Sequence, residues 1–433
     1  MRKMKDSGIE WIGEIPESWK TKRNKQLFFE VNERCENGNE HTLLSVSEYY
    51  GIAPKSDKIS DGEFETRAES LDGYKLCKVG DIVMNIMLAW KRSTGRSEYD
   101  GIVSPAYCVY RPIEDIDTKY YHYLFRTDIV ANLFKQYSTG IIESRLRLYP
   151  EKFLALSMLV PPLPEQRAIS AYLDRQCALI DSVTEKTKAS IEEYKKLRQA
   201  VITQAVTKGV RGERPMKEVE NGFLDHIPNN WIYQKVKNFI AMPVIDGPHE
   251  SPELYDDGIP YISATAIVDS KIDFSLMRGY ISAEYCDECD KRYKPQINDI
   301  LLIKLGASTG QVAIVDTDRR FNIWVPLAAI RCDDSVVPKF IYYSFQSEYL
   351  LRQMELSWTY GTQQTLGVKT IEQLRFVLPI IDEQQEIAAY LDHKCAEIDA
   401  LITKKETFLA ELEAYKKSLI YEYVTGKKEV PQA

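Results

Sequence analysis

Two segments of the chain carry apolar positions at alternating spacings of three and four. The first stripe comprises Ile180, Val183, Thr187, Ser190, Tyr194, Leu197 and Val201, and the second comprises Ile398, Leu401, Lys405, Phe408, Leu412, Tyr415 and Leu419. Such spacing puts the side chains along one face of a helix, as in the a/d seam of a coiled coil. The pattern predicts two long helices. Polar Thr187, Ser190 and Lys405 weaken the seam locally but help to fix its register.

The two predicted helices begin with nearly the same sequence. Residues 161–181 align without a gap to residues 379–399, at an offset of 218, with 12 of 21 positions identical. Because related surfaces can mate about a pseudo-twofold axis, we expect the two seams to face each other in an antiparallel pair. The alternative is that each helix packs only on the core of its own domain.

A shorter repeat precedes each variable region: residues 11–19 and 223–231 both end in Ile-Pro-x-x-Trp. The chain is therefore expected to contain an N-terminal repeat segment (1–19), a first domain (20–160), a central helix (161–214), a second repeat segment (215–231), a second domain (232–378) and a C-terminal helix (379–433). Within the domains, 78–87 resembles 296–305, 104–112 resembles 325–333, and 138–146 lies where 359–367 falls. The segments 78–87 and 296–305 are each a polar turn followed by an apolar, strand-like run. We expect an α/β fold: two mixed α/β domains in pseudo-twofold tandem repeat, with the helices as an antiparallel coiled coil.

Composition fits a globular protein of two domains. The chain has 433 residues, 44% hydrophobic and 28% charged, and no apolar run near the roughly 18 residues that span a bilayer. Eight cysteines without disulfide-like clustering, and no signal peptide, favour reduced thiols in the cytoplasm. The net charge of −8 argues against a free-standing nucleic-acid binder, unless local basic patches or basic partner chains supply the phosphate contacts.

Motifs for catalysis are weak. Pro161-Pro162 lacks the preceding Asp or Asn of an adenine methyltransferase motif, and no G-x-G-x-x-G is present. The segment 306–310 resembles a phosphate loop but lacks its Lys-Ser/Thr, and Asp-x-Lys at 117–119 lacks the upstream partner of a nuclease site. Cys286 and Cys289 have the spacing of half a zinc site, yet no second pair of ligands is evident, so free thiols in a loop are expected. We expect neither a catalytic residue nor a metal ligand in this chain.

Taken together, the motifs resemble those of the specificity subunit of type I restriction–modification systems. They are the segment 9–19, the Gly-Asp-Ile-Val at 80–83 with Asn-Asp-Ile-Leu at 298–301, and Pro-x-Pro-Glu-Gln-x-x-Ile at 162–169 with a weaker copy at 382–387. The resemblance covers nearly the whole chain. It implies that two target recognition domains each read half of an interrupted double-stranded DNA sequence, and that the helices hold them apart.

The same resemblance implies partners. Two modification (methyltransferase) subunits would dock on the helices, and restriction subunits with ATP-dependent activity would join the complex. S-adenosylmethionine, ATP and Mg²⁺ would be bound by those partners, none by this chain.

The stretch 180–205 would form roughly 38 Å of helix, close to the 34–36 Å turn of B-DNA, so a longer pair should lengthen the unread gap.

Candidate DNA contacts are polar side chains in turns, because Arg or Lys pairs with guanine and Asn or Gln with adenine. In the first domain they are Lys91, Arg92, Ser93, Thr94, Arg96, Thr139, Arg145 and Arg147, beside Trp90. In the second they are Lys304, Ser308, Thr309, Gln311, Tyr360, Thr362, Gln363, Gln364 and Lys369. Two other functions stay open: a two-domain DNA-modifying enzyme with a divergent active site, and a scaffold that joins proteins without touching DNA.

Overall fold

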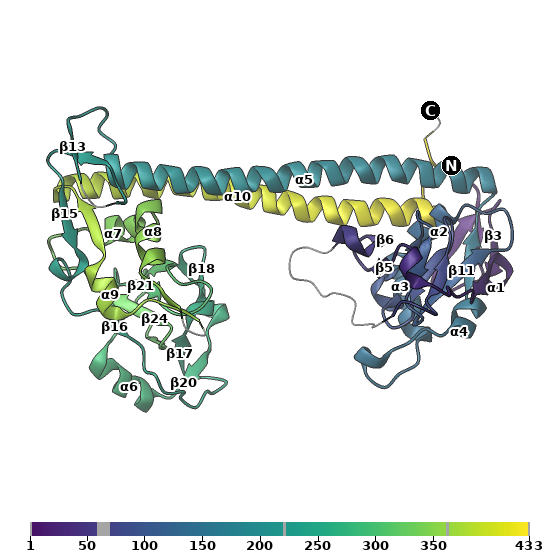
Figure 1. Ribbon diagram of the computed structural model, residues 1–433, viewed down its shortest axis with the longest axis horizontal. Helices are drawn as coiled ribbons and strands as arrows, with labels where there is room; N and C mark the ends of the chain where they lie inside the picture. The colour runs from purple at the N-terminus through teal and green to yellow at the C-terminus, as the bar shows by residue number, and fades with distance from the viewer. Residues whose placement is uncertain (1, 59–69, 220–221, 361–362, 432–433) are drawn as a thin grey trace. The chain divides into compact units, whose positions relative to one another are not determined.

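The computed structural model (Figure 1) describes residues 2–58, 70–219, 222–360 and 363–431. The chain divides into two compact units. Unit 1 comprises residues 1–187 and 407–433, and unit 2 comprises residues 188–406. Each unit therefore holds one variable region together with a part of both long helices. No helix in the described ranges is long and apolar enough to cross a membrane.

Unit 1 is built on a four-stranded antiparallel sheet in the order β4-β11-β8-β9. Its elements before the long helix are β1 (Met4–Asp6), β2 (Glu14–Pro16), β3 (Lys20–Arg23), α1 (Asn24–Leu27), β4 (Phe28–Val31), β5 (Leu44–Ser47), β6 (Gly51–Pro54), β7 (Lys75–Cys77), β8 (Ile82–Asn85), β9 (Thr94–Arg96), β10 (Gly101–Val103), β11 (Tyr107–Pro112), α2 (Thr118–Phe125), α3 (Asp128–Tyr137), α4 (Pro150–Ala155) and β12 (Ser157–Val160).

An aromatic core fills the space between this sheet and its helices. Tyr110 of β11, Phe125 of α2, Phe134 of α3 and Phe153 of α4 are all fully buried, and their rings touch at centroid distances from 4.5 to 6.0 Å. Rings of this size remove a large apolar area from water and are the main stabilising contact of the unit. The sheet is thereby held rigid beneath the loops that leave its strands.

Unit 2 repeats the plan with the sheet order β16-β24-β21-β22. Its elements are β13 (Met216–Glu218), β14 (His226–Pro228), β15 (Ile232–Lys235), β16 (Ile245–Asp246), β17 (Ile259–Ile262), β18 (Ile267–Val268), β19 (Lys271–Ile272), β20 (Gly279–Ile281), α6 (Ala283–Arg292), β21 (Ile300–Ile303), β22 (Val312–Ile314), β23 (Asn322–Ile323), β24 (Leu327–Ile330), α7 (Pro338–Phe345), α8 (Glu348–Leu356), β25 (Thr359–Tyr360), β26 (Gln364–Thr365), α9 (Val368–Gln373) and β27 (Arg375–Leu378).

The two sheets share one register. Ile82 pairs with Tyr110 in unit 1, and Ile300 pairs with Ile330 in unit 2. Tyr110 of β11 therefore corresponds to Ile330 of β24, an offset of 220. The alignment of 104–112 with 325–333 that the sequence favoured has an offset of 221, so it is wrong by one residue. Short apolar strands constrain a sequence alignment weakly, whereas the hydrogen-bond ladder admits one register only.

The long helices are α5 (Leu163–Lys208) and α10 (Ile381–Val424). Each ends at a left-handed glycine, Gly209 with φ +80° and Gly426 with φ +72°, the conformation that commonly closes a helix. Gly209 and Gly426 are 217 residues apart, one fewer than the repeat offset of 218, so both helices end at nearly the same place in the repeat.

The helices run antiparallel within each unit (Figure 1). In unit 1 Lys416 Nζ lies 2.6 Å from Asp181 Oδ1, and farther along Tyr423 stacks on Tyr172. In unit 2 Arg198 Nε lies 3.0 Å from Asp399 Oδ1, and Lys405 lies over the ring of Tyr194. A later residue of one helix meets an earlier residue of the other in both cases. The predicted α/β fold with an antiparallel helix pair is confirmed.

The contact stripe differs from the predicted seam at every second position of the second helix, and at Leu197 in the first. Four predicted seam residues are substantially exposed: Leu197, Leu401, Phe408 and Tyr415, at 40 to 55% of their surface. Ile191 is buried at 5%, next to the predicted Ser190, while the seam residues Ile180, Ile398 and Leu419 are buried as expected. The apolar residues allow two neighbouring stripes along each helix, one that starts with a spacing of three and one that starts with a spacing of four. Which stripe is buried depends on the face that the partner helix covers.

Candidate nucleic-acid interface

A half-buried carboxylate in the first turn of α5 holds the N-terminal repeat segment of unit 1. Glu165 accepts a hydrogen bond from Trp19 Nε1 at 2.9 Å and pairs with Arg2. Arg2 also lies over the Trp19 ring, 5.4 Å from its centroid. The Ile-Pro-x-x-Trp repeat therefore works as an anchor, placing an indole N–H where the helix offers an acidic side chain.

The same three residue types make the same contacts at the start of α10 in unit 2. Trp231 Nε1 donates to Glu383 Oε2 at 3.1 Å, Arg214 pairs with the other oxygen of that carboxylate, and Arg214 lies over the Trp231 ring at 5.0 Å. Glu383 is fully buried. Acidic residues at helix starts are favoured by the helix dipole, but here the carboxylate also has two specific partners.

The glutamine after each glutamate ties the long helix to the α/β domain of its unit. Gln166 donates to the carbonyl of Pro161 at 2.8 Å and accepts from the backbone N–H of Asp117 at 2.9 Å. Gln384 does the same with Pro379 at 2.9 Å and Val337 at 2.8 Å. Buried amides that satisfy both their donor and acceptor fix geometry strongly. Each domain is thus locked to its helix at the start of α2 or α7.

The Gly-Asp and Asn-Asp motifs are structural as well. Asp81 is 2% exposed and receives two hydrogen bonds from Arg111, both 2.9 Å. Asp299 is 1% exposed and receives two from Arg331, at 2.8 and 2.7 Å. Hydrogen bonding to Asp299 raises the pKa of Arg331. These bidentate pairs hold the turn that starts β8 or β21, and each of these strands leads directly into a loop of candidate DNA contacts.

In unit 1 the structure brings the two predicted clusters together. The segment after β8 bonds to the later segment through Leu148 N and Ile86 O at 2.9 Å. Thr139 and Arg147 exchange two backbone hydrogen bonds, at 2.9 and 3.0 Å, so that 139–147 forms a closed loop. Of the candidates, Lys91, Thr139, Arg145 and Arg147 are exposed.

The other candidates of unit 1 have partners inside the unit. Buried Ser93 and Thr94 donate to backbone carbonyls at 3.1 and 3.0 Å. Arg96 bonds to Thr118 at 3.0 Å, and Arg92, which has φ +65°, lies 2.8 Å from Asp128. These side chains support the loop from within. Among the candidate cations of unit 1, Lys91, Arg145 and Arg147 are the ones exposed to solvent.

Unit 2 shows the same pairing of loops. Gly306 N donates to Gln364 O at 3.1 Å, and Leu366 N donates to Lys304 O at 2.8 Å, which joins 304–311 to the β25–β26 hairpin. Ser308, Gln311, Gln363 and Lys369 are exposed, Gln364 is half-buried, and Thr309 and Lys304 are buried. Two candidates cannot be placed: Thr362, like Gly361, lies outside the described residues, and the same holds for the side chain of Tyr360.

Lys304 belongs to a charged cluster beneath its loop. Its Nζ lies 3.1 Å from Asp246 Oδ2, and Arg292 lies 2.7 Å from Asp246 Oδ1. Burial alone would raise the pKa of Asp246, but the hydrogen bond and charge of Lys304 and the charge of Arg292 lower it. Asp246 is thus ionised, and Lys304 neutralises it instead of pointing freely to solvent.

Cys286 and Cys289 lie on helix α6, and not in a loop as the sequence suggested. Both thiols are buried, and burial raises the pKa of Cys286 to about 11, so it is a protonated thiol at neutral pH. Within the described ranges no group of three or more His, Cys, Asp or Glu side chains is arranged to hold a metal ion.

Sequence reasoning missed one residue of the unit 1 surface. Lys135, in the last turn of α3, lies over the Trp90 ring at 5.1 Å, and Lys91 lies over the same ring at 5.2 Å. Lys135 also pairs with Glu143 of the 139–147 loop, so the end of α3 contacts both loops of this surface. The only signal in the sequence is a basic residue near the end of an amphipathic helix, which is common on solvated faces.

Comparisons with known proteins agree with this arrangement. Residues 248–413 match the model of the family described as "Type I restriction modification DNA specificity domain". The chain is 30% identical over 279 residues to the specificity subunit of the type I restriction enzyme EcoBI of Escherichia coli; the match covers 62% of this chain and 57% of that subunit's length.

Two solved structures share the fold. A chain from a structure of the type I restriction–modification system has a TM-score of 0.70 and 17% identity, with 96% of this chain and 99% of that chain covered. The HsdS subunit from Thermoanaerobacter tengcongensis has a TM-score of 0.52 and 18% identity, with 96% and 98% covered. With two mixed α/β domains, each tied by a Trp–Glu contact to an antiparallel helix pair, and with residues 248–413 matching the specificity-domain family, the chain is similar to the specificity subunits of type I restriction–modification systems.

Proposed function

We propose that this chain is the non-catalytic DNA-recognition subunit of a type I restriction–modification complex. Each unit reads one half of an interrupted target, and the helix pair sets the distance between the halves. The observation that carries the proposal is the matched pair of loops at the ends of β8 and β21. In both units a turn fixed by a buried Asp–Arg pair leads into exposed polar side chains.

The loops have the chemistry of groove contact. Unit 1 offers exposed Lys91, Arg145 and Arg147, whereas unit 2 offers exposed Gln311, Gln363 and Lys369. Arg and Lys suit guanine and phosphate, and Gln suits adenine. Since the scaffold is repeated and the exposed residues are not, the two units would read different half-sites. A DNA target read in this way has two different half-sites, separated by a gap of bases that are not read.

Partners would supply the remaining functions. Two methyltransferase subunits would dock on the helices and bind S-adenosylmethionine, and restriction subunits would bring ATP and Mg²⁺. The chain's net charge of −8 is consistent with weak DNA binding until such partners contribute cations.

The decisive experiment maps methylated adenines in a host that carries this chain with its methyltransferase subunit. We expect a bipartite motif with a constant gap. Replacing residues 232–378 by the matched region of another specificity subunit should change one half-site and leave the other intact. Methylation at a continuous motif, or a change in both halves, would contradict the proposal. Methyl transfer by the purified chain alone would contradict its non-catalytic part.

A further inference from the structure

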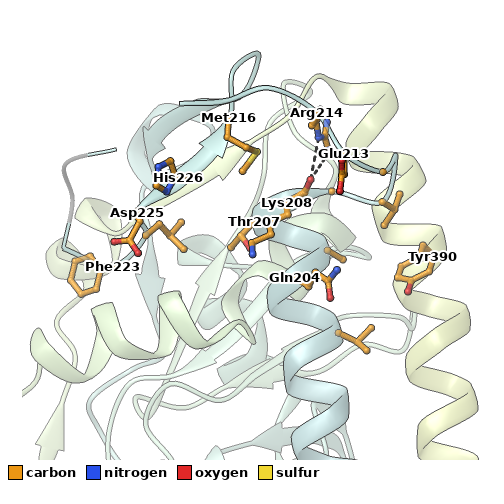
Figure 2. Close-up of a pocket in the computed structure, with 16 residues that line it drawn as sticks. Gln204, Thr207, Lys208, Glu213, Arg214, Met216, Phe223, Asp225, His226 and Tyr390 are labelled. Atoms are coloured by element: carbon orange, nitrogen blue, oxygen red, sulfur yellow. Dashed lines mark hydrogen bonds between the residues drawn. The ribbon is translucent and has the colours of Figure 1, made fainter. Parts of the chain in front are cut away.

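A cavity of about 940 Å³ opens at the C-terminal end of α5 in unit 2 (Figure 2). Its walls include Val201, Gln204, Ala205 and Lys208 of α5 and Tyr390 of α10. In Figure 2 Gln204 and Tyr390 point toward each other across the pocket. The pocket lies away from the recognition loops and has no part in the DNA contacts proposed above.

The internal repeat shows what fills the matched place in unit 1. There Tyr423 of α10 packs on Tyr172 of α5, with ring centroids 4.6 Å apart and an interplanar angle of 40°. The two hydroxyls lie 3.3 Å from each other, and Tyr423 is only 5% exposed. An aromatic side chain therefore completes the packing between the helices at this level.

Unit 2 keeps one half of this pair and lacks the other. At the repeat offset of 218, Tyr390 matches Tyr172, and Ala205 matches Tyr423. Tyr390 is 38% exposed, and in the part of the chain that the structure describes no aromatic ring packs against it. Ala205 itself is buried at 2% and carries no ring that could pack on Tyr390, so the exposed part of Tyr390 borders the cavity.

We infer that this pocket accepts a tyrosine or phenylalanine side chain from a methyltransferase subunit, an inference that rests on the proposed function for the identity of the partner. The incoming ring stacks on Tyr390 in the position that Tyr423 occupies in unit 1. Val201 supplies an apolar wall, and Gln204 and Lys208 at the rim offer hydrogen bonds to a phenolic hydroxyl. Aromatic anchors in such pockets are frequent hot spots of protein interfaces.

The inference makes the two ends of the helix pair chemically different. At the unit 1 end the aromatic site is filled from within, and at the unit 2 end it is open to a partner. One of the two methyltransferase subunits thus gains an anchor that the other lacks.

The pocket itself is tested on the full chain with 4-fluorophenol, the side chain of tyrosine as a free probe, followed by ¹⁹F NMR line broadening. Ala205→Tyr should fill the pocket and abolish probe binding, and Tyr390→Ala should weaken it roughly tenfold. Ala200→Tyr, which adds a tyrosine on an exposed face of the same helix, is the matched control and should leave binding unchanged. Tyr423→Ala should create a second probe site in unit 1. Equal binding to the wild type and Ala205→Tyr overturns the inference.

The partner is tested by titrating the methyltransferase subunit onto the same variants. Ala205→Tyr should weaken the binding of one of the two subunits by roughly tenfold and leave the other unchanged, with circular dichroism verifying the fold. Unchanged binding of both subunits overturns the inference while the proposed function stands. If the wild-type chain binds no methyltransferase subunit, the proposed function itself fails.

Discussion

Trp231 donates its indole N–H to the fully buried carboxylate of Glu383 at 3.1 Å, and the matched Trp19 donates to Glu165 at 2.9 Å. The contact joins a short repeat segment to the first turn of a long helix far along the chain. It explains why these segments resemble each other while the domains between them differ: both helices need the same anchor, whereas the proposed DNA-reading surfaces do not need to match.

Removing Glu383 should therefore destabilise unit 2. Glu383→Ala leaves Arg214, whose side chain is 15% exposed, without its counter-charge, and we expect a loss of roughly 3–5 kcal/mol in the free energy of unfolding, the usual cost of breaking a buried pair. Chemical denaturation measures it. Asp382→Asn, at the exposed neighbouring position, is the control and should cost less than about 0.5 kcal/mol. Equal stabilities of the two variants would show that the anchor is dispensable.

The phase of the helix contact can be tested with two apolar residues of α5. Ile191 is 5% exposed and Leu197 is 47% exposed. Ile191→Ala should destabilise the protein by about 2–4 kcal/mol, because it removes buried methylene groups and leaves a cavity. Leu197→Ala should cost below about 1 kcal/mol. Thermal or urea denaturation compares them, and the reverse order would restore the seam first read from the sequence.

The proposed spacing role of the helices predicts a change in the DNA gap. Seven residues added to both α5 and α10 at matched positions preserve the contact stripe and lengthen the pair by roughly 10 Å, about three base pairs. Methylated-adenine mapping should show both half-sites unchanged and the gap widened. Insertion into one helix alone should abolish methylation because the stripes no longer match. A gap that stays constant in the double insertion would argue against spacing by the helices.

Substitutions in the loops should separate base reading from phosphate contact. Gln363→Ala is expected to relax the preference at one position of the second half-site, since an exposed Gln can bond adenine through two groups. Lys91→Ala should weaken binding across sequences and reduce the salt slope by about one. Binding of the methyltransferase complex to DNA at several salt concentrations distinguishes the two. Lys404→Ala, an exposed cation on α10, is the control.

Stability of unit 1 should fall below neutral pH. The ring of His122 packs against Gly51 and Gly95, and its Nδ1 accepts the backbone N–H of Arg96 at 3.2 Å. Desolvation, and then the charge of Arg126, lower the pKa of His122 to about 3. The unfolded chain takes up this proton near pH 6.5, so the contribution is complete above that pH and is lost as pH falls toward 3, by about 1.4 kcal/mol per pH unit.

The measurement is urea denaturation at pH 7.5 and pH 5.0. His122→Gln, which keeps an acceptor for the Arg96 N–H, should reduce the difference between the two pH values, and the same substitution at the exposed His393 should leave it unchanged. An identical pH difference in all three proteins would exclude His122 as the source.

Sequence alone determined the repeat, because a duplicated unit keeps the residues that anchor it. The Glu-Gln pairs at 165–166 and 383–384, the Ile-Pro-x-x-Trp segments and the Asp of each strand-opening turn are visible as letters, and they lead to two like units with paired helices. The contacts that these residues make could not be read from the sequence. The partners of Glu383, Trp231 and Arg214, lie more than 150 residues earlier in the chain.

Tertiary structure decided the rest. It selected the helix face that is buried. In the sequence, a seam through Ser190 and Leu197 fits the apolar pattern as well as one through Ile191, and only the partner helix decides between them. It also divided the polar loop residues into those that point to solvent, such as Gln363, and those that neutralise a buried charge, such as Lys304. Local periodicity records which side chains are apolar, but burial and ion pairing arise between residues distant in sequence, and only the folded chain brings those together.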